Sequence, residues 1–131
     1  MKPIFIDTSA LYALVSRNDR FHEKAKNIYM NLIDEGRVLY TSAYVLVETI
    51  ALIHSRLGFE VVRKFMKGIE NIIEVIYIDE KLHKEIWRLL EDKEGQISFV
   101  DCSTVLLVKQ MDAELFAFDE DLKREGFKVL C

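Results

Sequence analysis

The stretch Ile4-Phe5-Ile6-Asp7-Thr8-Ser9-Ala10-Leu11 decides how the rest of the chain is interpreted. Its first three residues are apolar and rich in β-formers, and a helix-like apolar run follows Ser9. The pattern predicts a buried strand that ends in a carboxylate, at the end of the strand where open α/β sheets bind ligands. The ordinary alternative is that Asp7, Thr8 or Ser9 caps the helix that follows. The choice depends on whether other acids converge on Asp7.

Length and composition predict one folded domain over residues 1–131. Of the 131 residues, 50% are hydrophobic and 31% are charged, and the apolar runs are too short for a membrane span. The first residues do not have the pattern of a signal peptide, so we expect a cytoplasmic location. Cys102 and Cys131 lie outside any metal-binding spacing and are expected to be free thiols. A net charge of −4 argues against wholesale coating of nucleic acid, but it is compatible with a local basic patch.

Strand-like runs alternate with helical stripes along the whole chain, which predicts a single α/β domain. After Ile4–Ile6, strands are expected at Val38–Thr41, Val75–Ile78, Leu115–Phe118 and Lys128–Leu130. Helices are expected within 21–33, 42–57, 59–69, 79–90 and 98–108, with short helices after residue 9 and over 119–125. This alternation favours parallel crossovers and a sheet covered on both faces. The last crossover has only about ten residues, so the final strand is expected to be short or displaced.

Glu48 lies inside the apolar helical run Tyr44–Leu52. Its neighbours three and four residues away are largely apolar, so the carboxylate is expected on an apolar face. A buried carboxylate needs a cation, a metal or a proton to offset the loss of water. The alternatives are that Glu48 reaches solvent or pairs with a core arginine.

Asp101 and Asp119 each allow two interpretations. The segment Ser98–Asp101 fits a capping box, but the apolar residues around the acid predict that Asp101 points inward. Asp119 ends an apolar run at a strand-to-helix turn, as the first acid does, and it too can be a cap. Asp121 is a competing candidate close to Asp119.

Taken together, the four acids predict a metal site. Two stand at strand carboxyl ends and two on apolar helix faces or starts, and all four can reach one crevice of a parallel sheet. Clustered carboxylates repel and raise one another's pKa unless a divalent cation lies among them. Oxygen ligands without Cys or His favour Mg²⁺ or Mn²⁺.

The order and spacing of these motifs resemble the PIN-domain ribonucleases, and among them the VapC-like toxins of bacterial and archaeal toxin–antitoxin pairs. The matching segments are Ile6–Leu11, Thr41–Glu48, Phe99–Asp101 and Phe118–Leu122. The resemblance implies a PIN-like three-layer α/β/α fold with a parallel sheet of four to five strands in the order 3-2-1-4-5. It also implies an acidic site made of Asp7, Glu48, Asp101 and Asp119. Family members usually carry Thr or Ser two residues before the last acid, where this chain has Ala117 and lacks that hydrogen bond.

The activity that the resemblance implies is metal-dependent hydrolysis of RNA phosphodiester bonds by an endoribonuclease toxin. The metal would lower the pKa of a bound water and neutralise charge on the phosphate. Asp7 and Asp101 are expected to be the principal ligands, with Glu48 and Asp119 binding directly or through water. Thr8 and Ser9 are expected to donate hydrogen bonds near Asp7, and one of them to cap the helix.

Basic side chains should surround the crevice, because the acids alone would repel a phosphate. The candidates are Arg17, Arg20, Lys24, Arg63, Lys64 and Lys67, and for each of them singly a solvated helix face is the ordinary alternative. The apolar third and fourth helices favour a surface covered by a partner, which in the resembled family means a homodimer and a small antitoxin protein. The alternative function is a catalytically weak PIN-like module that binds RNA or protein, favoured by Ala117 and the acidic net charge.

Overall fold

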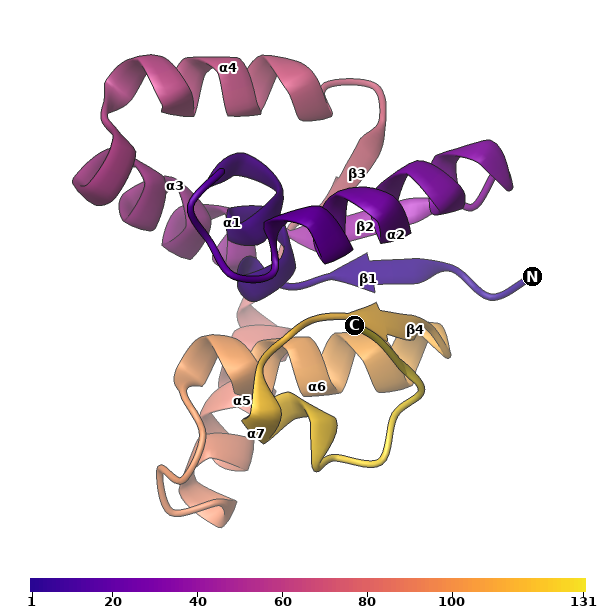
Figure 1. Ribbon diagram of the computed structural model, residues 1–131. Coiled ribbons are helices and arrows are strands. Elements are labelled where there is room, and N and C mark those ends of the chain that lie inside the picture. Colours follow the sequence, from indigo (N-terminus) through magenta and orange to yellow (C-terminus); the bar gives the residue numbers. More distant parts are fainter.

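The computed structural model describes residues 1–131 as one α/β domain (Figure 1). The strands are β1 (Ile4–Ile6), β2 (Leu39–Ser42), β3 (Ile73–Ile76), β4 (Glu114–Phe116) and β5 (Val129–Leu130). The helices are α1 (Thr8–Val15), α2 (His22–Asp34), α3 (Ala43–Leu57), α4 (Phe59–Ile69), α5 (Glu80–Asp92), α6 (Phe99–Met111) and α7 (Glu120–Lys123). No helix is both long enough and apolar enough to cross a bilayer.

All neighbouring strands pair in parallel, in the order β3-β2-β1-β4-β5, which confirms the expected sheet. β1 lies at the centre, with Ile4 paired to Leu39 on one side and to Glu114 on the other. β5 has two residues, as expected from the short crossover that precedes it. Because β1 and β4 are adjacent and parallel, the residues that follow them emerge at the same edge of the sheet.

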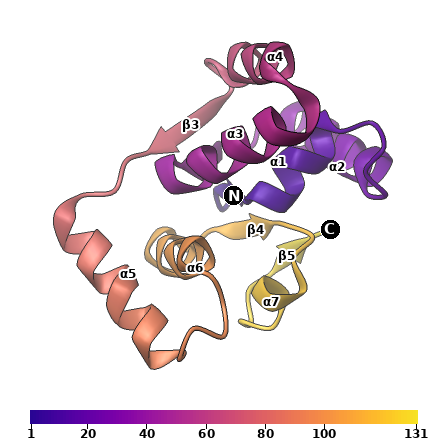
Figure 2. The ribbon, with the colours of Figure 1, turned by 90° about the vertical axis from the view of Figure 1, so that its left-hand side faces the viewer.

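Helices cover both faces of this sheet and make three layers. Figures 1 and 2 show α1 to α4 on one face and α5 to α7 on the other. The three residues of β1 are fully buried, and those of β4 are buried as well. Strands enclosed on both sides in this way are typical of parallel sheets.

Side chains at the helix starts fix several boundaries. Asp79 caps α5, as expected, by accepting a hydrogen bond from the Leu82 N–H at 2.8 Å. Gly58, with a φ of 94°, makes the corner between α3 and α4, a backbone conformation that favours glycine. The third strand begins two residues earlier than expected, at Ile73. The charged Glu74 interrupts the apolar run, and only its pairing with Tyr40 of β2 shows that the strand includes it.

Candidate metal centre

Three of the four expected acids come together at the carboxyl edge of the sheet. Asp7, Asp101 and Asp119 each offer a carboxylate oxygen, and these three oxygens lie within 4.8 Å of one another. Asp7 follows β1 and Asp119 follows the neighbouring β4 segment, while Asp101 comes from the first turn of α6. The packing of α6 against the sheet therefore brings the third carboxylate over the end of the central strands.

Asp7 belongs to the acidic cluster and also caps the helix that follows it, although Thr8 or Ser9 was expected to be the cap. It is 2% exposed and caps α1, accepting from the Ser9 N–H at 3.5 Å and from the Ser9 hydroxyl at 3.3 Å. The expectation that Thr8 or Ser9 would be the cap is therefore wrong. The Thr8 hydroxyl donates to the Val45 carbonyl at 3.5 Å instead of to the carboxylate.

Ser9 also connects two of the acid-bearing segments. Its Oγ accepts from the Phe118 N–H at 2.9 Å while it donates to Asp7, so one hydroxyl links the end of β1 to the residue before Asp119. The predicted hydrogen bond from Ser9 to Asp7 is present. Through these two hydrogen bonds, the Ser9 hydroxyl fixes the position of the Asp7 carboxylate relative to the segment that carries Asp119.

Burial and repulsion between carboxylates raise the pKa values of Asp7 and Asp101. Burial first, and then the charge of Asp101, raises the pKa of Asp7 to about 7. Burial first, and then the charge of Asp119, raises the pKa of Asp101 to about 6, although hydrogen bonds from Ser98 oppose the shift. Three carboxylates in this space are therefore costly to ionise without a cation. An all-oxygen donor set of this kind fits Mg²⁺ or Mn²⁺.

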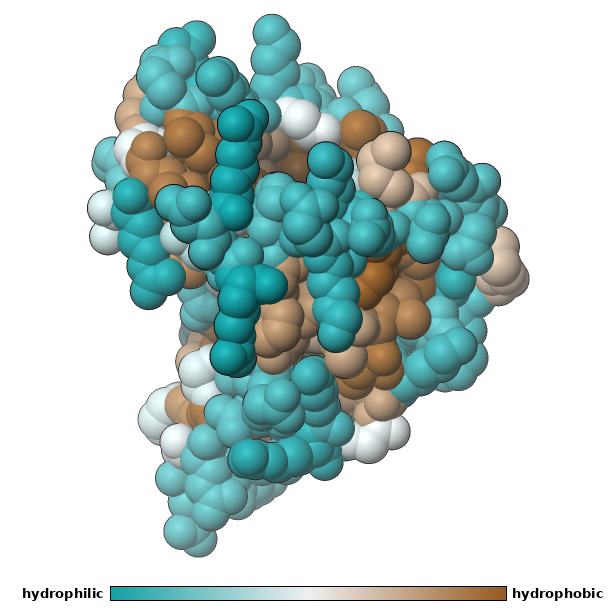
Figure 3. Space-filling view, viewed as in Figure 1, coloured by the Kyte–Doolittle hydropathy of each residue, from teal (hydrophilic) through white to brown (hydrophobic).

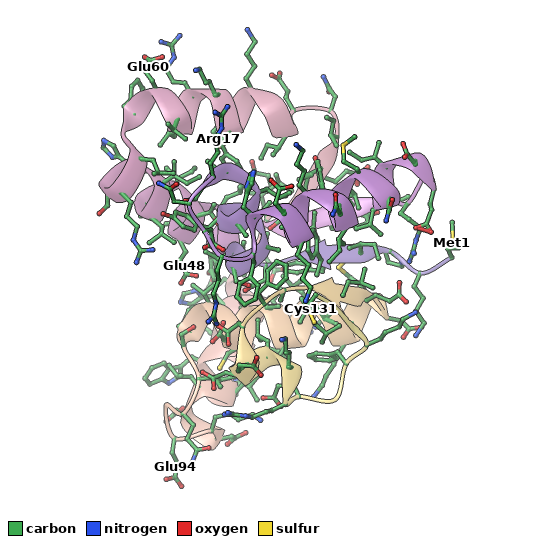
Figure 4. All side chains as sticks on the ribbon, viewed as in Figure 1. Met1, Arg17, Glu48, Glu60, Glu94 and Cys131 are labelled. Atoms are coloured by element: carbon green, nitrogen blue, oxygen red, sulfur yellow. The ribbon has the colours of Figure 1, made fainter.

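Glu48 lies apart from the cluster. Its side chain is exposed, so the expected burial on an apolar face is wrong and the alternative, access to solvent, is what the structure shows. The spacing along α3 could not show that this face is left uncovered. Glu48 nevertheless raises the pKa of Asp101 through its charge, which places it near the cluster. In Figure 4 it lies at the flank of the molecule, where α3 approaches α6.

Asp119 also caps a helix, accepting from the Asp121 N–H at 2.8 Å at the start of α7. Asp121 itself does not belong to the three-acid cluster. Its carboxylate pairs with Arg124 at 3.2 Å, which gives it a separate local partner.

Thr104 is a residue of the site that the sequence analysis did not identify. It is fully buried on α6, and its hydroxyl donates to Asp7 at 3.4 Å. Ala117, two residues before Asp119, is fully buried and has no hydroxyl to donate. The available signal was the position of Thr104 three residues after Asp101, which places both on one helix face.

Among the basic candidates, Arg20 has the most direct structural connection to the acids. Its guanidinium carbon lies 4.5 Å from the centre of the Phe21 ring. That ring stacks on Phe118 with centroids 4.5 Å apart, and Phe118 directly precedes Asp119. Arg20 is exposed and can therefore meet a phosphate that approaches from solvent.

The other basic candidates lie elsewhere. Arg17 and Lys64 line a cavity of about 520 Å³ at the far end of α1, and Figure 4 shows Arg17 pointing towards α4, away from Glu48. Arg63 pairs with Glu60 at 3.1 Å on the exposed face of α4. Lys67 lines a second cavity of about 520 Å³ beside β3, and Lys24 is exposed on α2.

Comparisons with known proteins agree with this geometry. The sequence matches the PIN domain family over residues 4–128. A search of curated proteins finds no match. Among solved structures, the chain is similar to VapC20 of Mycobacterium tuberculosis, described as a toxin that cleaves the sarcin-ricin loop, with 27% identity, 95% of each chain covered and a TM-score of 0.82.

Two protein complexes with bound DNA contain chains of the same fold. The match to VapBC2 of Rickettsia felis has 16% identity, covers 96% of each chain and has a TM-score of 0.71. The match to VapBC of Salmonella typhimurium has 16% identity, covers 98% of this chain and 97% of that one, and has a TM-score of 0.69. With the family match over nearly all of its length, the chain belongs to the PIN-domain family and is VapC-like.

Proposed function

We propose that the protein is a metal-dependent endoribonuclease and the toxin of a type II toxin–antitoxin pair. The observation that carries the proposal is the cluster of three carboxylate oxygens within 4.8 Å of one another, in a fold shared with an RNA-cleaving toxin. The raised pKa values of Asp7 and Asp101 add to it, because they mark a site that gains from a bound cation.

The residues of the cluster can hold Mg²⁺ or Mn²⁺. Asp7, Asp101 and Asp119 would be ligands, and Glu48, which is exposed and lies outside this cluster of three, would take part directly or through water. When bound, the metal supplies charge neutralisation at the phosphate and an activated water. The hydroxyls of Ser9 and Thr104 fix the orientation of the Asp7 carboxylate.

The partner of such a toxin would be a small antitoxin protein. Its proposed seat is a groove along α4, made of three adjoining cavities of about 520, 190 and 520 Å³. The middle cavity shares Val15 and Phe65 with the first, and it shares Ile69 and Ile73 with the last. Figure 3 shows apolar residues reaching the surface between α3 and α4, where this groove begins. Two of the similar structures are complexes named VapBC, which supports a partner chain. A homodimer and a cytoplasmic location remain predictions.

Cleavage of RNA by the purified protein tests the enzyme. We expect cleavage with Mg²⁺ or Mn²⁺, no cleavage with a chelator, and loss of cleavage in Asp7→Asn. Asparagine caps helices as well as aspartate does, so this variant should keep the thermal stability of the metal-free protein. Asp34→Asn removes the same charge at an exposed position on α2 and should cleave normally.

Two results would contradict the enzyme. One is equal cleavage by Asp7→Asn, and the other is no cleavage by the wild type with any divalent metal. RNA binding without cleavage would favour the alternative function, a binding module of the same fold.

A further inference from the structure

Three aromatic rings from three different helices form a cluster at one side of the acids. Tyr44 comes from α3, His83 from α5 and Phe99 from α6. The Phe99 centroid lies 5.3 Å from that of His83 and 5.9 Å from that of Tyr44. The Tyr44 hydroxyl is hydrogen-bonded to Nδ1 of His83. We call these three residues the aromatic cluster.

The aromatic cluster borders the acidic site through two of its members. Tyr44 lies one helical turn before Glu48 on α3, so the two side chains share a face. Phe99 is the first residue of α6 and lies two residues before Asp101. Helices α3 and α6 pack against each other, so these two helix segments approach each other. The rings therefore stand where a chain bound at the acids would continue.

Core packing does not account for the aromatic cluster. Neither Tyr44 nor Phe99 belongs to the main hydrophobic core or packs against it. His83 is exposed, and the other two rings are partly exposed. The rings therefore present flat apolar area and two polar edges to solvent beside a charged site.

We propose that the aromatic cluster is a nucleobase-binding subsite, which holds a base of the RNA next to the phosphate bound at the acids. The proposal rests on the proposed ribonuclease function. Every base has a π-face, so stacking on Tyr44 and Phe99 adds affinity with little dependence on sequence. The polar atoms of Tyr44 and His83 lie at the ring edges, where they can form hydrogen bonds with a base edge.

Binding of RNA oligonucleotides that lack one base tests the subsite. The probe is a single-stranded RNA about eight nucleotides long, made resistant to cleavage by 2′-O-methyl groups, in versions with one abasic position each. In the wild type, removal of one particular base should weaken binding roughly tenfold or more. Phe99→Leu and Tyr44→Leu keep apolar volume without a flat ring. In these variants, removing the same base should weaken RNA binding little beyond the effect of the substitution itself.

The matched control is the aromatic pair at the other end of α3. His54 and Phe59 also meet as a ring pair, with centroids 6.2 Å apart, at the corner between α3 and α4. Phe59→Leu should retain the base dependence of the wild type. Tyr44→Phe keeps the ring but removes the hydrogen bond to His83. It should retain most of the base dependence, and this result would show that stacking on the ring matters more than the hydrogen bond.

The alternative is that the aromatic cluster only anchors α5. In that case Phe99→Leu and Tyr44→Leu would lower the unfolding temperature but show the same abasic losses as the wild type. That result, or the absence of any position where the base matters, would overturn the proposal. Because the probe is not cleaved, these results are independent of the cleavage assay that tests the proposed function.

Discussion

Asp7 uses one carboxylate for two interactions, since it caps α1 and also faces the carboxylates of Asp101 and Asp119. A cap normally gains from its negative charge at the helix start, whereas this one lies in a buried site that disfavours the charge. The backbone N–H groups of Ser9 and Thr8 lower the pKa of Asp7 but do not overcome burial. A cation bound at this site, as proposed, would therefore favour release of the proton from Asp7.

The stability of the metal-free protein should depend on pH through Asp7 and Asp101. Both folded pKa values are raised above the ordinary value of 3.8, so between pH about 4 and about 7 the folded state holds protons that the unfolded chain releases. The contribution of Asp7 and Asp101 to the free energy of unfolding therefore decreases as the pH rises through this window.

Added Mg²⁺ should reverse that loss, because the metal binds the ionised carboxylates. We expect a larger rise in unfolding temperature at pH about 8 than at pH about 5. The measurement is thermal unfolding with and without Mg²⁺, and Asp7→Asn is the control that should lose most of the rise. Equal rises at both pH values would contradict the assignment of these acids as ligands.

Thr104→Val should raise the concentration of metal needed for half-maximal cleavage by roughly tenfold, because it removes a hydroxyl that orients Asp7. Thr104→Ser keeps the hydroxyl and should restore the wild-type requirement. Thr49→Val is a matched control, since the buried Thr49 hydroxyl donates to the Val45 carbonyl at 2.7 Å and not to an acid. If the two valine variants behave alike, Thr104 has only a packing role.

At the scale of elements, the hydrophobic pattern predicted the kind of each element more reliably than strand ends and exposed faces, and the strand order came from the resemblance to the PIN-domain family. Asp7 and Asp119 could be placed at one edge because each directly follows an apolar run. Glu48 could not be placed, because its spacing along α3 shows which residues share its face and not what covers that face. Thr104 was missed because a threonine in an apolar helix is indistinguishable from a core residue until its contact with Asp7, just after β1, is known.

The start of α6 combines stability with placement of an acid. The Ser98 hydroxyl accepts from the Asp101 N–H at 3.0 Å, and hydrogen bonds from Ser98 lower the pKa of Asp101. We expect Ser98→Ala to lower the free energy of unfolding by about 1 kcal/mol and to raise the metal requirement. Asp79→Ala removes the cap of α5 and should cost similar stability without changing the metal requirement. Chemical denaturation and metal titration of cleavage would separate the two effects.

At the scale of the whole molecule, charged side chains are paired at one edge of the sheet and unpaired at the other. The carboxyl edge gathers unpaired acids, whereas at the amino edge Glu114 is paired with Arg37 at 2.5 Å and with Lys128 at 2.7 Å. Arg37 also donates to the Lys2 carbonyl at 2.7 Å. These contacts connect the segments that lead into β1, β2, β4 and β5. The amino edge therefore contributes ion pairs that stabilise the fold, whereas the carboxyl edge holds the candidate metal site.

Glu114→Gln should lower the free energy of unfolding by roughly 3 kcal/mol at neutral pH, because it leaves the mostly buried Arg37 without its ion-pair partner. Hydrogen bonds from Lys128 and then Arg37 lower the pKa of Glu114 below 4.5, so its contribution is lost as the pH falls through the lowered value. The difference between wild type and variant should therefore shrink as the pH falls below 4.5 and through the lowered pKa of Glu114. Glu60→Gln, in an exposed pair with Arg63, should change stability little, and a similar loss in both variants would contradict a role for burial.

The central place of β1 also has a consequence for the synthesis of the protein. The chain leaves the ribosome from its amino end, so Asp7 emerges well before its neighbours across the sheet, β4 and the Asp119 segment. Until they arrive, β1 has a partner on only one side and no third carboxylate lies close by. An activity that destroys RNA would therefore arise in the growing chain only after the segment that carries Asp119 has emerged and paired with β1.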